Sequence, residues 1–349
     1  MCHVAVMPQV QQWLPDAAYE APQPMLAPYA PAPDVHGDSF SLQPVGAFSL
    51  REAAMFGFGQ RHDDVFDGCM RLCFCLDGYA TQVGVAVHQD ATGRIIGTVT
   101  NMTGQRAPVS TVADQVARML SLDRDSRGYD ELVARDPRLA PLAAAAHGLR
   151  PPLFYSPYEA ALWSVISARR PLRIAVLSRQ CLSQAVSPRF EIAGRVMWSA
   201  PLPHQLCEIG AEGIAAACGI DPLRARRVLA IAEAALRGHL NACQLMQLPL
   251  ADARQALQQL PGIGPFYSEL ILIRSTGVTD VLPADEPRFL ALLGALYGLA
   301  RSATPQEAEQ LALDWSPWRT WVAVLVRAVS SRVGLVSERS FGRRATPKR

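Results

Sequence analysis

The stretch Leu257-Gln-Gln-Leu-Pro-Gly-Ile-Gly-Pro-Phe-Tyr-Ser-Glu-Leu270 decides the fold of the C-terminal half of the chain. A helical pattern runs into Leu260, and the tight turn Pro261–Gly264 interrupts it. Pro265 suits the first position of a second helix, because the N–H that proline lacks would have no helical partner there. Leu260 and Ile263 supply apolar plugs for the turn. The stretch therefore predicts a hairpin of two helices.

The two glycines of this turn, Gly262 and Gly264, allow positive φ and the close approach of another backbone. The amide groups of the turn have no helical partner, and together with the helix dipole they form a small site for an anion such as a phosphate. A hairpin that only packs two helices is the alternative for a bare Gly-x-Gly. The longer Leu-Pro-Gly-Ile-Gly pattern resembles the helix-hairpin-helix DNA-binding motif, and this resemblance implies binding of a DNA backbone without reading of the base sequence.

A second informative stretch, Val281-Leu-Pro-Ala-Asp-Glu-Pro287, places Asp285 21 residues after Gly264. Its apolar first residues lead to an aspartate at the start of the next predicted helix. An aspartate there is commonly an N-cap that accepts backbone N–H groups. Such a cap would also keep the carboxylate ionised and oriented, so a capping role and a catalytic role are compatible.

The hairpin and the Val-Leu-Pro-x-Asp stretch at this separation resemble the helix-hairpin-helix, Gly/Pro, Asp superfamily of base-excision DNA glycosylases. The 3-methyladenine DNA glycosylase II branch is the most similar, because Ser316-Pro-Trp-Arg319 before an apolar helix and a small β domain ahead of the helices also match it. The resemblance covers about residues 40–335 and is specific at 257–290. It implies that Asp285 is the catalytic aspartate, which stabilises the positive sugar as the base departs or prepares the attacking water.

The resemblance also implies roles for other residues. A glycosylase flips its target base out of the duplex and fills the gap. The implied DNA-binding residues are Gly262, Ile263, Gly264 and Pro265 at the hairpin and Arg169 at the gap-filling position; the implied base pocket contains Phe266, Leu270 and Trp163; and the backbone carbonyls of Gln258, Leu260 and Ile263 are implied to hold a monovalent cation.

The chain departs from the family at several positions. Ala168 stands where the family has a Gln, Leu270 where the branch has a pocket Tyr, and Arg327 where its last helix has a Trp. Two functions therefore stay open. One is a monofunctional DNA glycosylase that removes damaged bases, above all alkylated purines. The other is a catalytically inactive DNA-binding or lesion-sensing protein on the same fold.

Some family members also cut the strand, using a Lys two residues after the second hairpin glycine. Here that position is Phe266, and the only lysine of the chain is Lys348. Without a nearby amine to form a Schiff base, water must accept the sugar. An aromatic ring at this position suits stacking on an electron-poor methylated base. Simple core packing is the alternative for Phe266.

The net charge of +2 hides an uneven distribution. Residues 1–150 hold 11 Lys and Arg against 16 Asp and Glu, whereas residues 151–349 hold 22 against 15. The basic half is the candidate nucleic-acid half. This split argues against a third possibility, a purely structural helical domain with no DNA role.

The pattern along the chain predicts an α+β N-terminal domain followed by an all-α helix-hairpin-helix DNA glycosylase domain. The predicted parts are a disordered Pro-rich tail at 1–38, a small α+β domain at 39–148, a helical domain at 149–335 and a basic tail at 336–349. In the α+β domain we expect helices at 50–60 and 112–120 and strands at 70–76, 81–88 and 94–100. Everything from Pro151 onward is expected to be helical.

Composition also bounds partners and cofactors. No apolar run reaches the ~18 residues of a membrane span, and no secretory signal is evident, so we expect a cytoplasmic protein, nucleoid-associated if it is bacterial. The family resemblance implies a monomer whose partner is double-stranded DNA with damaged bases. The eight cysteines indicate reduced thiols, with a metal at Cys73 and Cys75 as the alternative. No cofactor is expected to be required. Family members with an iron–sulfur cluster place four cysteines after the catalytic helix, and none lies beyond Cys243 here, so no cluster is expected.

Overall fold

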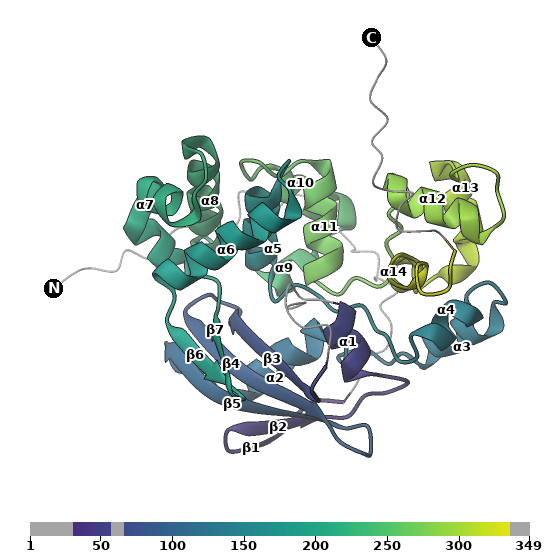
Figure 1. Ribbon diagram of the computed structural model, residues 1–349, viewed down its shortest axis with the longest axis horizontal. Helices are drawn as coiled ribbons and strands as arrows, with labels where there is room; N and C mark the ends of the chain where they lie inside the picture. The colour runs from purple at the N-terminus through teal and green to yellow at the C-terminus, as the bar shows by residue number, and fades with distance from the viewer. Residues whose placement is uncertain (1–30, 57–65, 336–349) are drawn as a thin grey trace, which may run out of the picture.

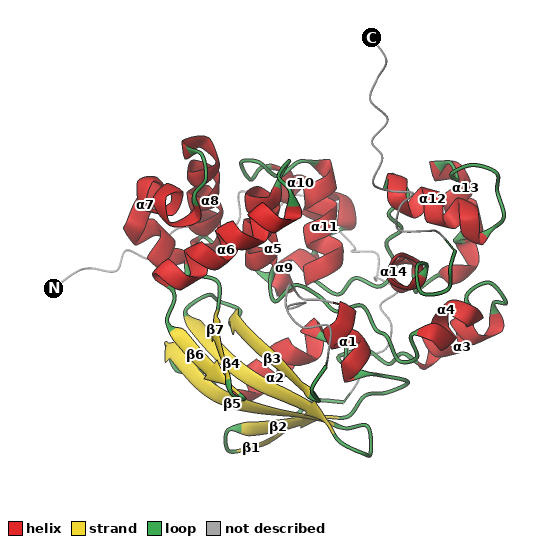
Figure 2. Cartoon of the chain, in the orientation of Figure 1, coloured by secondary structure: helices red, strands yellow, loops and turns green. Residues whose placement is uncertain are grey.

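A computed structural model describes residues 31–56 and 66–335 of the chain (Figure 1). Five antiparallel strands form one sheet in the order β1-β2-β5-β4-β3, and most of the helices gather on one side of it (Figure 2). The strands are β1 (Asp34–His36), β2 (Ser39–Leu42), β3 (Cys69–Cys75), β4 (Thr81–Gln89) and β5 (Ile95–Gly104).

In β3 and β4, successive side chains point to opposite faces of the sheet, and both faces are buried. Val83, Val85 and Val87 of β4 are fully buried in a core with α1 (Leu50–Phe56) and α2 (Val109–Met119). On the opposite face, Ala86 packs in a smaller cluster with Phe190. Both faces of the central strands are therefore covered.

The cover of the second face is a β-hairpin that the sequence analysis missed. Strands β6 (Arg189–Ile192) and β7 (Arg195–Trp198) pair antiparallel. Ala193 and Gly194 join them, both with positive φ (43° and 75°), as in the two-residue turns that match strand twist. The expectation that everything after Pro151 is helical is therefore wrong. Phe190 and Ile192 alternate with polar residues and bury against the sheet, and this is a strand pattern.

Two groups of helices complete the structure, each around its own core. The first group comprises α5 (Pro157–Ser167), α6 (Leu172–Val186), α7 (Pro203–Cys218), α8 (Pro222–Leu236), α9 (Ala242–Gln247), α10 (Leu250–Gln258) and α11 (Pro265–Ser275). The second comprises α3 (Arg127–Arg135), α4 (Ala140–Ala145), α12 (Pro287–Leu296), α13 (Pro305–Leu311), the short 3₁₀ helix η2 (Leu313–Trp315) and α14 (Arg319–Val329).

These cores do not follow a division of the chain near residue 148. Helices α3 and α4 come from the first half of the sequence, yet they pack with α12, α13 and α14 (Figure 1). The hairpin β6–β7 comes from the second half, yet it lies on the sheet. The predicted boundary between residues 39–148 and 149–335 therefore separates segments that share a core.

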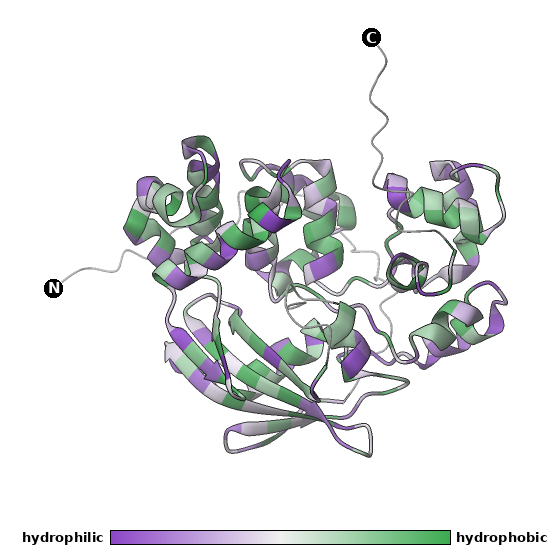
Figure 3. Ribbon diagram, in the orientation of Figure 1, coloured by the Kyte–Doolittle hydropathy of each residue, from purple (hydrophilic) through white to green (hydrophobic). Residues whose placement is uncertain are grey.

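The N-terminal tail is shorter than the sequence predicts. Asp34–His36 forms β1 and pairs with β2, so the Pro-rich tail does not extend to residue 38; the remainder of that prediction, residues 1–30, lies outside the described residues. The basic tail 336–349 and the end of the helix expected at 50–60 also lie outside them. Within 31–56 and 66–335, every helix is too short or too polar to span a lipid bilayer, and Figure 3 shows hydrophilic residues interspersed along α6, α7 and α8.

Candidate active site

The hairpin forms as the sequence predicts. Helix α10 ends at Gln258, the turn follows, and α11 begins at Pro265. The N–H of Ile263 donates to the carbonyl of Leu260 at 3.0 Å, which closes the turn. Leu260 and Ile263 are buried in the first helical core, while Gly262 and Pro265 are exposed. The apolar plugs thus fix the turn from inside and leave its outer edge at the surface.

The two glycines of the turn differ in their backbone conformation. Gly262 has a φ of 93°, which favours glycine, and a Cβ there would lie 2.9 Å from Cδ of Arg227. Gly264 has a φ of −97° and a ψ of −174°, an extended conformation open to any residue. A Cβ on Gly264 would meet nothing within 4 Å. The expectation of positive φ is therefore confirmed for Gly262 and wrong for Gly264.

The carbonyls expected to hold a cation come from the same turn. The carbonyl oxygen of Leu260 accepts the N–H of Ile263, so one of its two lone pairs is already engaged in a hydrogen bond. Within the described part of the chain, no group of three or more His, Cys, Asp or Glu side chains could hold a metal ion. The cation at Gln258, Leu260 and Ile263 stays a prediction from the resemblance.

The loop that carries Asp285 is fastened to helix α14. The Oγ1 of Thr320 accepts the N–H of Val281 at 2.8 Å and donates to the carbonyl of Val281 at 2.9 Å. The N–H of Thr320 donates to the carbonyl of Thr279 at 2.9 Å. Thr320 is buried, so these bonds have little competition from water. They hold the loop where it enters the Asp285 turn.

A charged contact reinforces the same junction. Asp280 accepts hydrogen bonds from Nε and Nη2 of Arg319, at 2.7 and 2.6 Å, and from Oγ of Ser316 at 3.0 Å. Burial acts to raise the pKa of Asp280, but these bonds outweigh it and lower the pKa. The Ser-Pro-Trp-Arg stretch at 316–319 therefore serves to bind the loop that leads to Asp285.

Asp285 itself is exposed, and it is not the N-cap of α12. The cap is Glu286, whose carboxylate accepts the N–H groups of Arg288 at 3.2 Å and Phe289 at 2.8 Å. Glu286 also pairs with Arg327 of α14 at 3.1 Å. The N-cap role considered for Asp285 is therefore wrong, because the helix begins one residue later than that role requires. The capping bonds go to Glu286, and the carboxylate of Asp285 stays accessible.

A second carboxylate lies close to Asp285 and was missed in the sequence. Glu269, in α11, pairs with Arg254 of α10 at 3.1 Å. Burial raises the pKa of Glu269, Arg254 opposes the shift, and the nearby Asp285 adds to it. The charge of Asp285 is therefore near enough to Glu269 of α11 to influence its ionisation. Glu269 lies three residues after Phe266, one helical turn, and this spacing is the signal that could have revealed it.

The chain is similar in sequence to known DNA repair proteins. No family model matches the chain. The DNA-3-methyladenine glycosylase of Bacillus subtilis is 22% identical over 210 residues, which make up 60% of this chain and 69% of that protein. The probable bifunctional transcriptional activator/DNA repair enzyme AlkA of Mycobacterium tuberculosis is 26% identical over 215 residues, 60% of this chain and 40% of the relative.

Two solved structures match over nearly their whole length. The 3-methyladenine DNA-glycosylase from Archaeoglobus fulgidus superposes with a TM-score of 0.69 at 19% identity, covering 85% of this chain and 99% of that one. The chain has the fold of the helix-hairpin-helix DNA glycosylases. The 8-oxoguanine glycosylase/lyase of Clostridium acetobutylicum matches with a TM-score of 0.60 at 16% identity, over 86% of this chain and 99% of that one. The family resemblance seen in the sequence is confirmed, and the 3-methyladenine branch is consistent with it.

On this glycosylase fold, the residues expected in the base pocket separate into two places. Phe266 is 61% exposed and meets Tyr267 edge to face, with the ring centroids 5.3 Å apart. Leu270 is half-buried one turn further along α11. Trp163 instead lies between α5 and α6, where the guanidinium of Arg179 sits 5.1 Å from the centre of its ring. Core packing, the alternative considered for Phe266, does not describe so exposed a ring.

The expected gap-filling segment of the glycosylase fold lies between α5 and α6. Ala168 caps the C-terminus of α5, and Arg169 follows with a φ of 54°. A left-handed conformation costs a residue with a side chain roughly 1–2 kcal/mol, so surrounding contacts must hold it. Arg169 is exposed and forms no hydrogen bond or ion pair with any described residue. Arg170 donates from Nη1 to Oγ of Ser178 at 3.1 Å.

Proposed function

We propose that the protein is a monofunctional DNA glycosylase of base excision repair, which hydrolyses the N-glycosidic bond of damaged bases in double-stranded DNA. Alkylated purines are its proposed substrates. The observation that carries this proposal is the exposed carboxylate of Asp285, on a loop that hydrogen bonds fasten to α14. The names of the sequence relatives support the same activity.

In the proposed reaction, the turn at Gly262–Pro265 holds a phosphate of the DNA backbone through backbone N–H groups and the dipole of α11. This contact positions the duplex without reading its sequence. The target base leaves the stack and its sugar approaches Asp285. The carboxylate stabilises the oxocarbenium-like sugar as the glycosidic bond breaks, or orients the water that attacks it.

Phe266 supports the choice of alkylated purines. Its ring is exposed at the start of α11, one turn before Glu269. A methylated purine is electron-poor and partly cationic, so an aromatic face attracts it more than it attracts a normal base. A base-release assay with wild-type protein on duplexes with alkylated, deaminated and oxidised bases tests the proposal. We expect release of alkylated purines; release of none of these bases would contradict it.

Strand cleavage is not part of the proposed reaction. β-Elimination needs an amine to form an imine with the sugar, and Phe266 occupies the position of the lysine used by strand-cutting family members. We expect an intact abasic strand that breaks only after heat or alkali. Borohydride should trap no covalent protein–DNA adduct. An adduct in stoichiometric yield would show that an amine attacks.

A catalytically inactive lesion-binding protein is the second candidate function. Ala168 cannot make the contacts of the family's Gln, and the Arg327 side chain is engaged with Glu286. Such a protein would bind abasic duplexes tightly and release no base. No cofactor is part of either proposal; the proposed cation at the hairpin would be structural, and the proposed location is cytoplasmic, on the nucleoid.

A further inference from the structure

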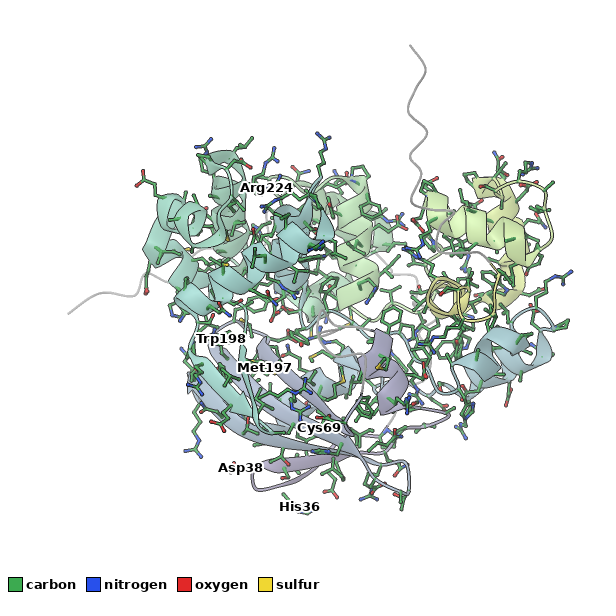
Figure 4. All side chains as sticks on the ribbon, in the orientation of Figure 1. His36, Asp38, Cys69, Met197, Trp198 and Arg224 are labelled. Carbon is green, nitrogen blue, oxygen red and sulfur yellow. The ribbon has the colours of Figure 1, made fainter. Side chains whose placement is uncertain are left out.

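Arg224 of α8 reaches out of its own helix to the end of α5 (Figure 4). Its Nη1 donates to the carbonyl oxygens of Val165 at 3.0 Å, Ile166 at 3.1 Å and Ala168 at 2.8 Å. These carbonyls belong to the last turn and cap of α5, where the helix itself supplies no N–H partners. One nitrogen with two hydrogens serves three acceptors, so at least one hydrogen is shared.

The guanidinium is fixed from its other side as well. Asp221 caps α8 by accepting the N–H of Arg224 at 2.9 Å, and its second oxygen accepts Nε of Arg224 at 3.3 Å. The hydrogen bond from the Arg224 N–H and its guanidinium lower the pKa of Asp221. The side chain of Arg224 is only 19% exposed. Arg224 is therefore a fixed strut between the start of α8 and the end of α5, and not a solvated surface cation or a free phosphate contact.

The strut ends beside the strained residue of the segment. Ala168, which Arg224 binds, directly precedes Arg169 in its left-handed conformation. On the other side, the N–H of Arg170 donates to the carbonyl of Ser167 at 3.1 Å and its side chain binds Ser178. Both neighbours of Arg169 are thus held, while the side chain of Arg169 is exposed. Such an arrangement fixes the backbone that carries the Arg169 side chain.

We propose that Arg224 is a positioning residue that holds Ala168–Arg170 in the conformation needed to fill the gap of a flipped base. This inference rests on the proposed function, in which Arg169 is the gap-filling residue. Without the strut, the last carbonyls of α5 would turn to water and Arg169 would relax from positive φ. Recognition of a gap in the duplex would weaken. Backbone binding at the hairpin would not, because the hairpin turn lies between α10 and α11 and Arg224 forms no hydrogen bond with it.

The first test needs no DNA. Trypsin can cut after Arg169 only where the segment leaves its folded conformation. Arg224→Gln should raise the rate of this cut by about tenfold, because it leaves the α5 carbonyls without their cation. Arg224→Lys keeps a charged donor and should give a smaller rise. Arg226→Gln, an exposed arginine of the same helix, removes the same charge and should leave the rate unchanged.

The second test measures binding of two duplexes that differ only in one abasic analogue. Wild-type protein should prefer the abasic duplex, and Arg224→Gln should lose about tenfold of that preference while its affinity for the intact duplex changes by less than about twofold. Arg224→Lys should restore part of the preference, and Arg226→Gln should keep it.

The outcomes separate this inference from the proposed function. If wild-type protein shows no preference for the abasic duplex, the proposed function fails and the inference with it. If wild-type protein shows the preference and Arg224→Gln retains it, Arg224 is only a structural cap and the inference alone is overturned, whatever the trypsin result. Unchanged cleavage after Arg169 in Arg224→Gln would overturn it as well.

Discussion

At the scale of single residues, the two hairpin glycines allow stability and binding to be tested separately. Gly264 is extended and has free space where a Cβ would lie. Gly264→Ala should therefore leave the melting temperature unchanged. If a phosphate approaches the backbone here, the added methyl group should weaken binding to every duplex alike, at low salt, in a fluorescence-anisotropy titration.

Gly262→Ala is the matched comparison. Its φ of 93° and the contact of a new Cβ with Arg227 at 2.9 Å should cost about 1–2 kcal/mol of unfolding free energy. A change in duplex affinity caused by Gly262→Ala would therefore combine a loss of binding with a loss of folding stability. Unchanged duplex affinity in Gly264→Ala would count against the hairpin as the phosphate site.

The sequence predicts buried plugs better than it predicts exposed functional residues. Leu260 and Ile263 are 7% and 4% exposed, because an apolar side chain in a turn between two helices is stabilised by burial against them. The choice of cap between Asp285 and Glu286 depends on where α12 begins, and sequence patterns place helix ends only to within a residue or two. The partners of Arg224 on α5 lie 56 to 59 residues away in the sequence, so no local pattern indicates its contacts.

At the scale of elements, the loop before α12 depends on α14. Thr320→Val keeps the shape of the side chain and removes both of its hydrogen bonds with Val281. The backbone groups of Val281 would lose buried partners, at a cost of about 1–3 kcal/mol in unfolding free energy. Because the same bonds fasten the loop of Asp285, base release should slow more than duplex binding weakens.

Urea denaturation and single-turnover base release measure the two effects. Thr111→Val, at an exposed position of α2, is the control that should change neither. A Thr320→Val protein with reduced stability but wild-type single-turnover rate would show that α14 does not position Asp285.

Most long helices could be predicted from the sequence, because their apolar periodicity is local. The second hairpin helix was expected to begin at Pro265, and α11 begins there. The hairpin β6–β7 was missed, because its Arg-Phe-Glu-Ile and Arg-Val-Met-Trp strands are four residues each and are stabilised by a sheet far away in the sequence. Short elements of this kind depend on tertiary packing, which overrides local propensity.

At the scale of the whole molecule, Glu159 links the first helical core to the sheet. It lies in the first turn of α5, and its Oε1 accepts the N–H of Cys75 on β3 at 3.0 Å. Burial raises the pKa of Glu159 to about 7, although Cys75 and Arg179 act to lower it. The folded protein therefore binds this proton more tightly than the unfolded chain does.

The pH dependence of stability follows from that difference. The contribution of protonated Glu159 is fully present below the unfolded pKa and is lost as pH rises through about 7. The unfolding free energy of wild-type protein should therefore fall relative to Glu159→Gln between about pH 5 and pH 8, by up to about 3 kcal/mol. Urea denaturation of both proteins across this range measures it. Parallel pH profiles would mean that Glu159 does not titrate at this junction.

The arrangement of the three cores could not be predicted from the order of the segments. A sequence boundary near residue 148 looks natural, since strands give way to long helices there. In the structure, α3 and α4 instead pack with α12–α14, and the hairpin β6–β7 packs on the sheet. The pairing of one apolar helix or sheet face with another depends on all the other faces that compete for it. A short stretch of sequence does not contain that information.

The central claim is that the exposed carboxylate of Asp285 performs the chemistry while other parts of the fold hold the DNA. Single-turnover base release from an alkylated duplex, measured beside duplex affinity, tests it most directly. Asp285→Asn should reduce base release by at least about a hundredfold, a loss of ~2.7 kcal/mol or more of transition-state stabilisation, with affinity within a few-fold of wild type. Asp314→Asn, an exposed aspartate of η2, should release base at the wild-type rate. An Asp285→Asn protein that releases base at a near-normal rate would contradict the account.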